Sequence, residues 1–341
     1  MPGSVTGFVP RSAAIRNNSH MKNLIIFAVL LGIVGYGGSK LLLHHKVGQG
    51  VDSAVLAVSP FVGIEYDGVS STMTGELTID GITAHIAGFN DPLYIDRFGI
   101  DTPSYFSLLD LAEVSENIQS PDEVIPESFG FIVEGIRMRV NADYFKRAYA
   151  ASVSDVSQEA QAEDAARCTG KYGFSPEALT RLGYSEQVVS LTAHFRRSDG
   201  KFTVEATSLV EDMWNITASL TLDGDMVGEL SKGPRFRPRM KDMRIEFEDL
   251  SLNERVGNYC GRLGLSDEQI VAAQLDKLHY LGETFGIEFD EYVIDPYIEY
   301  VKGKSTLVVT ARPHEPISLT QISLYKPSDV PALLDLSAEA L

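Results

Sequence analysis

A long apolar run near the N-terminus, Leu24–Leu43, constrains this chain more than any other feature. Its only charged residue is Lys40, whose long side chain can reach toward a membrane interface. A membrane-spanning helix needs about 20 mostly apolar residues. The run therefore predicts a transmembrane helix that anchors the chain. A cleaved signal peptide, with Lys22 ahead of the apolar region, is the alternative interpretation.

The charges around this run predict its orientation. Arg11, Arg16 and Lys22 precede it, which favours an N-terminus on the cytoplasmic side. No later apolar run is as long, so we expect the rest of the chain on the other side, exported to the periplasm from the inner (cytoplasmic) membrane. Residues 1–20 lack a hydrophobic period and are interpreted as a flexible extension, unless translation starts at Met21.

The remainder of the chain predicts an α+β fold in which a mainly antiparallel, bent β-sheet carries a few helices at its edges. Residues 61–88 and 131–140 alternate apolar and polar side chains, as strands do. The clearest hairpin places Leu191, Ala193 and Phe195 before a turn at Asp199-Gly200. Further strands are expected at 214–222 and 243–247, and another hairpin around Gly303.

Two longer segments predict helices. One is capped by Asn141 and runs through residues 142–166, and its acidic second half, residues 151–167, is interpreted as an exposed helix end or a linker. The other is an amphipathic helix over 267–281. We therefore expect an N-terminal β-rich part at 51–150, and a C-terminal α+β part at 168–341.

Cys168 and Cys260 are the two cysteines of the chain. Each precedes a similar helix start, with Ser175 and Ser266 as N-cap candidates. In an exported chain, two cysteines in matching contexts favour a disulfide between them. The alternative is a reactive thiol close to a helix N-terminus.

Two stretches of the chain, residues 91–109 and 315–333, resemble each other at a constant offset. In the first, the apolar pattern shifts by one residue between Ile95 and Phe98, and in the second the same shift lies between Leu319 and Ile322. One extra residue in a strand is a β-bulge, which bends the strand. A Pro-Ser pair follows in both stretches and predicts a corner before a helical turn.

The pattern after the apolar run resembles AsmA-like bacterial envelope proteins over roughly residues 24–111. The matching residues are Gly75, Leu77, Ile79, Gly81, Ile82, Pro92, Leu93, Ile95, Phe98 and Ile100. This resemblance implies a curved antiparallel sheet with an apolar inner face that carries lipid. The chain is shorter than a protein that bridges an envelope, and it has the two cysteines and the acidic segment in addition.

Four cations, Arg235, Arg237, Arg239 and Lys241, alternate along one segment. On a strand they share one face, and Pro238 predicts that this strand lies at an edge of the sheet. They form a candidate binding face for an acidic partner or for lipid headgroups. Alternatively, they pair with the acidic helix of the same chain or protect an exposed edge.

No catalytic, metal-binding or cofactor-binding motif is present, so we predict no enzyme activity and no cofactor. The formal net charge of −18 argues against nucleic-acid binding. The sequence favours a single-pass, membrane-anchored interaction or assembly factor of the cell envelope, acting without catalysis. The alternative is a protein that holds the acyl chains of lipid in an apolar β-groove.

Overall fold

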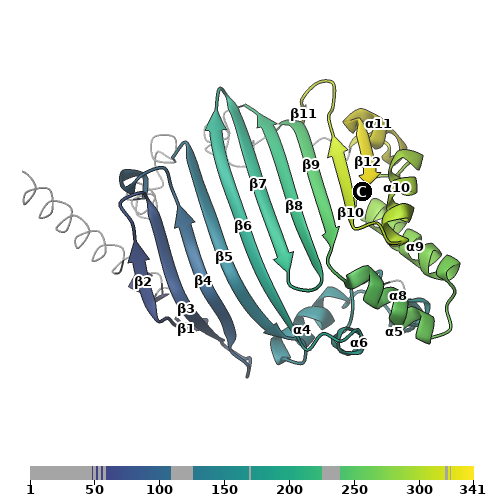
Figure 1. Ribbon diagram of the computed structural model, residues 1–341, viewed down its shortest axis with the longest axis horizontal. Coiled ribbons are helices and arrows are strands. Elements are labelled where there is room, and N and C mark those ends of the chain that lie inside the picture. The colour runs from purple at the N-terminus through teal and green to yellow at the C-terminus, as the bar shows by residue number, and fades with distance from the viewer. Residues whose placement is uncertain are drawn as a thin grey trace, which may run out of the picture.

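The computed structural model describes residues 48, 51–52, 55–56, 59–108, 126–168, 170–224, 239–318, 322 and 324–341. It shows a large, open antiparallel sheet with several helices gathered beside one end of the sheet and below the ends of its central strands (Figure 1). The predicted combination of helices with a mainly antiparallel sheet is confirmed. The predicted span Leu24–Leu43 lies outside the described residues, and no helix within them is long and apolar enough to cross a membrane.

The 12-stranded sheet has the order β1-β3-β4-β5-β6-β7-β8-β9-β10-β12, with β2 also paired to β3 and β11 to β9. Its strands are β1 (Val62–Glu65), β2 (Gly68–Ser71), β3 (Glu76–Ile86), β4 (Leu93–Asp101), β5 (Ser128–Arg139), β6 (Glu186–Ser198), β7 (Lys201–Val210), β8 (Trp214–Asp223), β9 (Arg239–Asp249), β10 (Thr306–Ala311), β11 (Ile317–Ser318) and β12 (Leu336–Ala340). Because β5 pairs with β6, the sheet is continuous from the N-terminal part of the chain into the C-terminal part.

The helices occupy the intervals between strands. They are α4 (Asp143–Ser152), α5 (Gln158–Arg167), α6 (Pro176–Arg181), α8 (Leu252–Arg262), α9 (Asp267–Phe285), α10 (Glu291–Val301) and α11 (Val330–Leu334), and a short 3-10 turn, η3, covers Pro327–Asp329.

The predicted β6–β7 hairpin is confirmed. The two strands pair from Ser198 and Lys201 down to Val189 and Val210. Asp199 and Gly200 connect them with φ values of 50° and 69°. Positive φ at both central residues gives the turn a twist that matches that of the flanking strands, and an Asp-Gly pair tolerates it well.

The predicted bulge in β4 is wrong, because the register of β4 with both neighbours continues unbroken past Asp96. The shift of the apolar pattern is instead shared by three strands. Ile79, Phe98 and Val133 lie in register on one side of it, and the isoleucines at 82, 95 and 136 lie in register on the other. The pairing register changes one strand further along, between β5 and β6.

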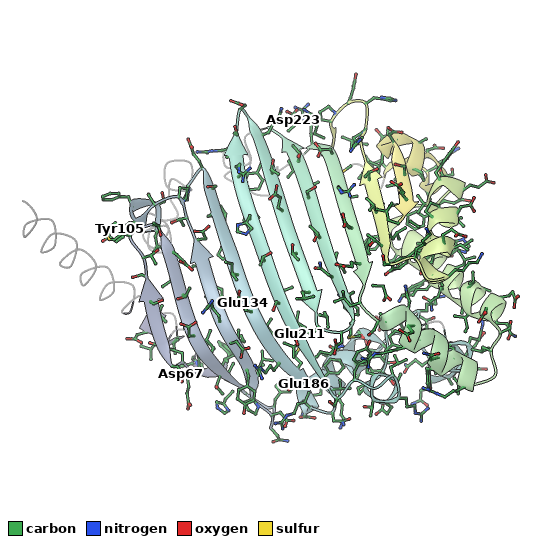
Figure 2. The ribbon with its side chains drawn as sticks, in the orientation of Figure 1. Asp67, Tyr105, Glu134, Glu186, Glu211 and Asp223 are labelled. Carbon is green, nitrogen blue, oxygen red and sulfur yellow. A yellow bond between two sulfur atoms is a disulfide. The ribbon has the colours of Figure 1, made fainter. Side chains whose placement is uncertain are left out.

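Two glycines lie in the row where the pattern shifts. Gly81 on β3 and Gly135 on β5 have φ values of 64° and 66°, a conformation that costs glycine little. Asp96 lies between them on β4, and a methyl group on Gly135 would overlap its carboxylate. Beside this row, Arg97 forms ion pairs with Asp80 at 3.0 Å and with Glu134 at 3.4 Å (Glu134 is labelled in Figure 2).

The N-cap predictions for two helices are confirmed. The Ser175 side chain accepts a hydrogen bond from the Ala178 amide at 3.1 Å and starts α6. Ser266 and Gln269 form a reciprocal capping box at the start of α9. These bonds satisfy amides that have no partner inside the helix, which explains why both helices begin where the sequence predicts.

The single helix predicted over 142–166 is wrong, because residues 153–157 separate α4 from α5. Asn141 is not its cap either. The N-cap of α4 is Ala142, and the first helical amide, that of Asp143, donates to the Asp91 carboxylate at 3.1 Å. Residues 158–167, predicted as linker or helix end, form α5 with Ser157 as its N-cap.

The hairpin predicted around Gly303 is also wrong, because residues 291–301 form the helix α10 and only β10 follows the turn. Apolar side chains recur at helical spacing along this segment, at 293, 294, 297, 298 and 301. Of these, Val293 is buried. Pro296 inside this segment hides the period, because proline normally ends a helix.

The two similar stretches occupy different places. Residues 93–101 form β4, between β3 and β5, whereas the second stretch contributes the two-residue strand β11, which pairs with β9. Both stretches do reach a helical turn at their Pro-Ser pair. Ser104 accepts a hydrogen bond from the Ser107 amide at 3.2 Å, and Pro327 begins η3. Leu319 lies outside the described residues, so the predicted second bulge stays a prediction.

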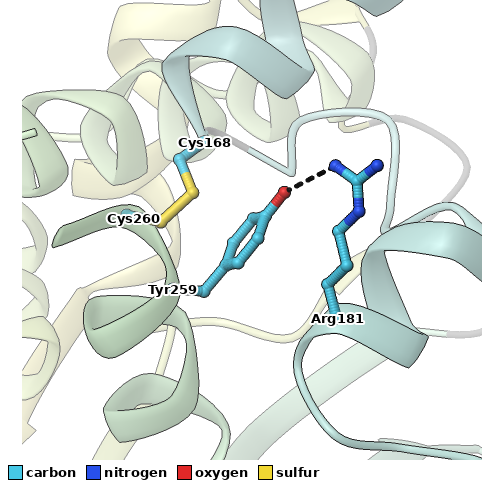
Figure 3. Close-up of a disulfide and its surroundings, with 4 residues drawn as sticks. All are labelled: Cys168, Arg181, Tyr259 and Cys260. Atoms are coloured by element: carbon cyan, nitrogen blue, oxygen red, sulfur yellow. Dashed lines mark hydrogen bonds between the residues drawn. A yellow bond between two sulfur atoms is a disulfide. The ribbon is translucent and has the colours of Figure 1, made fainter. Parts of the chain in front are cut away.

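The predicted disulfide joins Cys168, at the end of α5, to Cys260 in α8, with their α-carbons 6.0 Å apart (Figure 3). The reactive-thiol alternative is wrong, because neither sulfur is free. Beside the bond, Arg181 of α6 donates to the Tyr259 hydroxyl at 3.4 Å. Both cysteines are buried in a cluster that also contains Val140, Val210 and Met213, so the disulfide fastens helices onto the end of the sheet.

Candidate functional site

The central strands have one apolar face and one polar face. On β6, β7 and β8, Ala193, Ala206 and Ala218 lie in one cross-strand row. The next residue on each strand, Thr192, Thr207 and Thr217, forms the corresponding row of the opposite face. Successive residues of a strand point to opposite sides, so the alternation in the sequence separates the two faces.

The apolar face extends over neighbouring strands. The register continues it through Met243, Ile245 and Phe247 on β9. In the other direction it continues through Phe129, Phe131 and Val133 on β5. The phenylalanines at 129 and 195 stack with their ring centroids 4.8 Å apart, and Phe131 meets Phe195 edge to face at 6.1 Å.

The pairing of β6 with β5 shows that the apolar rows on both sides of the pattern shift lie on this same face. The register of β6 with β7 is unbroken, so Val189 and Leu191 share a face. Val189 pairs with Ile136, and Leu191 pairs with Val133. The apolar residues on both sides of the shift therefore lie on the apolar face, which reaches through β4 to β3.

Helices cover two margins of the apolar face. At the margin formed by Val189, Val210 and Trp214, side chains of α6, α8 and α9 pack in the cluster that holds the disulfide. At a second margin Phe202, Leu222 and Met240 pack with Val293 of α10 and Val330 of α11.

Between these margins the face is open to solvent. Phe131 is 36% exposed and Leu191 is 40% exposed, and the row of alanines beside them is only half-buried. Exposed apolar side chains that are adjacent in space indicate an interaction surface more strongly than isolated ones do.

The small alanine side chains form a low strip across this open region. Their row crosses β6, β7 and β8, a distance of about 10 Å at the usual strand spacing. Larger side chains flank it on both sides: Phe195, Val204 and Leu220 on one, and Leu191 and Ile216 on the other, where Ser208 lies between them. Methyl groups reach less far than these side chains, so the row is the floor of a shallow apolar trough across the strands. We call this the alanine trough.

The predicted cationic face is only partly visible. Arg235 and Arg237 lie outside the described residues, whereas Arg239 and Lys241 are exposed at the beginning of β9. Arg239 forms an ion pair of 2.7 Å with Asp223, at the upper end of β8 in Figure 2. Arg239 thus pairs with an acid of its own chain, but that acid is on a strand and not on the predicted acidic helix.

The predicted edge position of this segment is wrong for its described part. From Arg239 onward β9 pairs with β8 on one side, and with β10 and β11 on the other. Lys241 lies where the register of β8 and β9 shifts by one residue, which leaves it without a partner residue on β8.

Two of the pockets in the described part of the chain have volumes of about 350 Å³ each. One lies between α5 and α9, where Arg167 forms ion pairs with Glu163 and Asp276. The Lys171 ammonium lies 4.6 Å from the centroid of the Tyr280 ring. Burial raises the pKa of Asp164 and lowers that of Lys277 in this region. Its charges contact groups of the same two helices, and we interpret it as a helix contact.

The other pocket lies at one end of the sheet, where β4 ends. Asp101, His194, Arg196 and Glu205 bring charged or titratable groups to it. The sequence did not reveal this cluster, because its members come from three strands and meet only through the sheet register. Within the described residues, no group of His, Cys, Asp or Glu side chains is arranged to hold a metal ion.

Asn215 belongs to an Asn-Ile-Thr glycosylation sequon. The structure places it in the middle of the sheet on β8, where its side-chain amide donates to Glu248 at 3.1 Å. The amide nitrogen that would accept a glycan is thus engaged.

A search of curated proteins finds no match to this chain. A family model described as "Uncharacterized protein" matches residues 143–341, a range that includes β6–β12, both cysteines and the alanine trough. Because this match spans more than half of the sequence, the chain belongs to that family.

Proposed function

We propose that this protein is a membrane-anchored envelope protein that holds acyl chains of lipid on the apolar face of its sheet, without catalysis. Leu24–Leu43 would anchor it in the inner membrane, and the sheet would lie on the exported side. The observation that carries the proposal is the open, apolar region between the two helix-covered margins, where Phe131 and Leu191 remain 36% and 40% exposed.

The energetics of the face favour an apolar occupant. Burial of apolar surface contributes about 25 cal/mol per Å², or about 0.8 kcal/mol for each buried methylene group. An acyl chain is long, narrow and without hydrogen-bonding groups. The alanine trough is apolar along its floor and along both walls except at Ser208.

The disulfide supports the proposed compartment. Disulfides persist in oxidising environments such as the bacterial periplasm and are rare in the cytosol. The Cys168–Cys260 bond is therefore compatible with export behind the predicted anchor. A relation to AsmA-like proteins remains part of this proposal and rests on the sequence pattern of residues 24–111.

Photo-crosslinking in the native membrane tests the proposal. The photoreactive residue p-benzoylphenylalanine is placed at position 191 on the apolar face and, as a matched control, at position 192 on the polar face of the same strand. We expect lipid adducts of the full-length chain at position 191 and few at 192, measured by mass spectrometry after purification. Equal lipid labelling at the two positions, or none at either, would count against the proposal.

The second candidate is the interaction or assembly factor, and the edges of the sheet favour it. Among the described strands, β1 and β2 share one edge and pair with β3 alone, while β12 pairs with β10 alone. An exposed edge has unpaired amides and carbonyls that can add a strand from a partner. A photoreactive residue at position 64 on β1, or at the exposed position 339 on β12, would then crosslink to a protein rather than to lipid.

A further inference from the structure

The pocket at the end of β4 combines two rows of polar groups on the polar face of the sheet. In the first row Asp101, Gly130, His194 and Glu205 are in register on β4, β5, β6 and β7. In the second row Ser128, Arg196 and Thr203 are in register on β5, β6 and β7. Apart from Gly130, all of these residues line the pocket, whose volume is about 350 Å³.

Gly130 lets the imidazole of His194 lie between the two carboxylates of the first row. A methyl group at Gly130 would lie 2.5 Å from Nδ1 of His194, so the ring occupies the space above the glycine. Asp101 is on the far side of Gly130, and Glu205 is the neighbour of His194 on the next strand. Two acids thus flank one imidazole, an arrangement that attracts a cation carrying N–H donors.

The second row attracts an anion. Arg196 has hydroxyl-bearing neighbours on both sides, Ser128 on β5 and Thr203 on β7. A guanidinium with flanking hydroxyl donors suits a phosphate, which accepts several hydrogen bonds at once. Arg196 is two residues beyond His194, a distance of about 7 Å along the strand.

The charges of the two rows have no partners among the residues that the structure describes. No ion pair or side-chain hydrogen bond joins Asp101, His194, Arg196 or Glu205 to another described group. The corner of the pocket is nevertheless fixed, because the buried Thr102 hydroxyl bonds to the carbonyls of Gly75 at 2.8 Å and Ser104 at 2.9 Å.

We propose that this pocket binds a zwitterion in which a short spacer joins an ammonium group to a phosphate. The ammonium lies against Glu205, with Asp101 adding negative charge on the other side of His194, and the phosphate lies against Arg196, Ser128 and Thr203. The ligand is either a free small molecule or the headgroup of an amphiphile, and Phe129 and Phe195 also line the pocket. This assignment concerns the polar face and does not depend on the alanine trough.

Calorimetric titration of the full-length chain in a non-ionic detergent tests the assignment, with phosphoethanolamine as the probe. We expect saturable binding that Arg196→Gln and Glu205→Gln each weaken by about fivefold, the upper range for an exposed charge pair. Because Arg196 and Glu205 are exposed, neither variant should disturb the fold, and circular dichroism checks this.

Two glycine variants supply a matched comparison. Gly130→Ala displaces the His194 ring and is expected to weaken binding, whereas Gly99→Ala, whose methyl group would meet its nearest neighbour at an ordinary 3.5 Å, is expected to leave it unchanged. An ethanolamine lysophospholipid that binds more tightly than phosphoethanolamine identifies a headgroup, and equal affinity identifies a free zwitterion. Absence of saturable binding by both probes, or equal binding by wild type and Arg196→Gln, would overturn the assignment.

Discussion

Removing the Cys168–Cys260 disulfide should destabilise the fold by an amount that follows from its position. The bond spans 92 residues of sequence, which include α6 and the strands β6 to β9. In the chain-entropy model, opening a loop of 92 residues costs about 4.6 kcal/mol of the free energy of unfolding at 25 °C. This is a large part of the stability of an ordinary domain.

Two ways of breaking the bond separate this entropic cost from the loss of side-chain contacts around it. Cys168 is 4% exposed and Cys260 is fully buried, within the cluster that also contains Val256 and Ile270. Reduction by dithiothreitol removes the crosslink and keeps both sulfur atoms. The double variant Cys168→Ala/Cys260→Ala removes the sulfur atoms as well, so it should be less stable than the reduced wild type.

Urea unfolding of the full-length chain, followed by tryptophan fluorescence, measures these differences. The probe is Trp214, the single tryptophan, which packs against the disulfide cluster. Each single variant already breaks the crosslink, so the double variant should lose little more than either one. A loss below about 1 kcal/mol on reduction, or additive losses in the two single variants, would refute the chain-entropy reasoning.

Three further predictions follow from local features. Ser266→Ala removes the capping box of α9 and should lower the free energy of unfolding by about 1 kcal/mol, measured by urea denaturation. Gly135→Ala should cost about 1–2 kcal/mol, because φ is 66° and the new methyl group would meet Asp96, whereas Gly99→Ala is the mild control in the same assay. Burial raises the pKa of Tyr300 to about 12 from 10.0, so the folded state keeps its phenolic proton longer than the unfolded state does. The protein should lose stability as pH rises from 10 toward 12, less so in Tyr300→Phe, as followed by phenolate absorbance and circular dichroism.

Local signals carried most of the successful predictions. The Asp199-Gly200 turn, the alternation on β6 and the two serine caps act over a few residues, so they can be read from the sequence directly. The disulfide was predictable for a different reason, because two cysteines allow a single intramolecular pair.

The predictions that failed needed information from outside the segment. The shift between Ile95 and Phe98 is real, but its neighbours on β3 and β5 shift in the same row, so β4 needs no extra residue. The helix α10 was hidden by Pro296, although Val293 and the residues around it follow a helical stripe. The zwitterion pocket could not be found from sequence at all, because Asp101 and Arg196 meet only through the register of three strands.

The pattern shift shared by β3, β4 and β5 enlarges the open apolar face. Without it, Ile82, Ile95 and Ile136 would point to the polar face, since successive residues of a strand alternate sides. The shift returns them to the face that bears Leu191. It uses two glycines in the left-handed conformation, and a glycine within a strand costs about 0.5–1 kcal/mol relative to alanine. A face destined only for water would not need this device, and the helices at the two margins leave its centre uncovered. The geometry thus favours an apolar partner on the open region over a purely structural role for these residues.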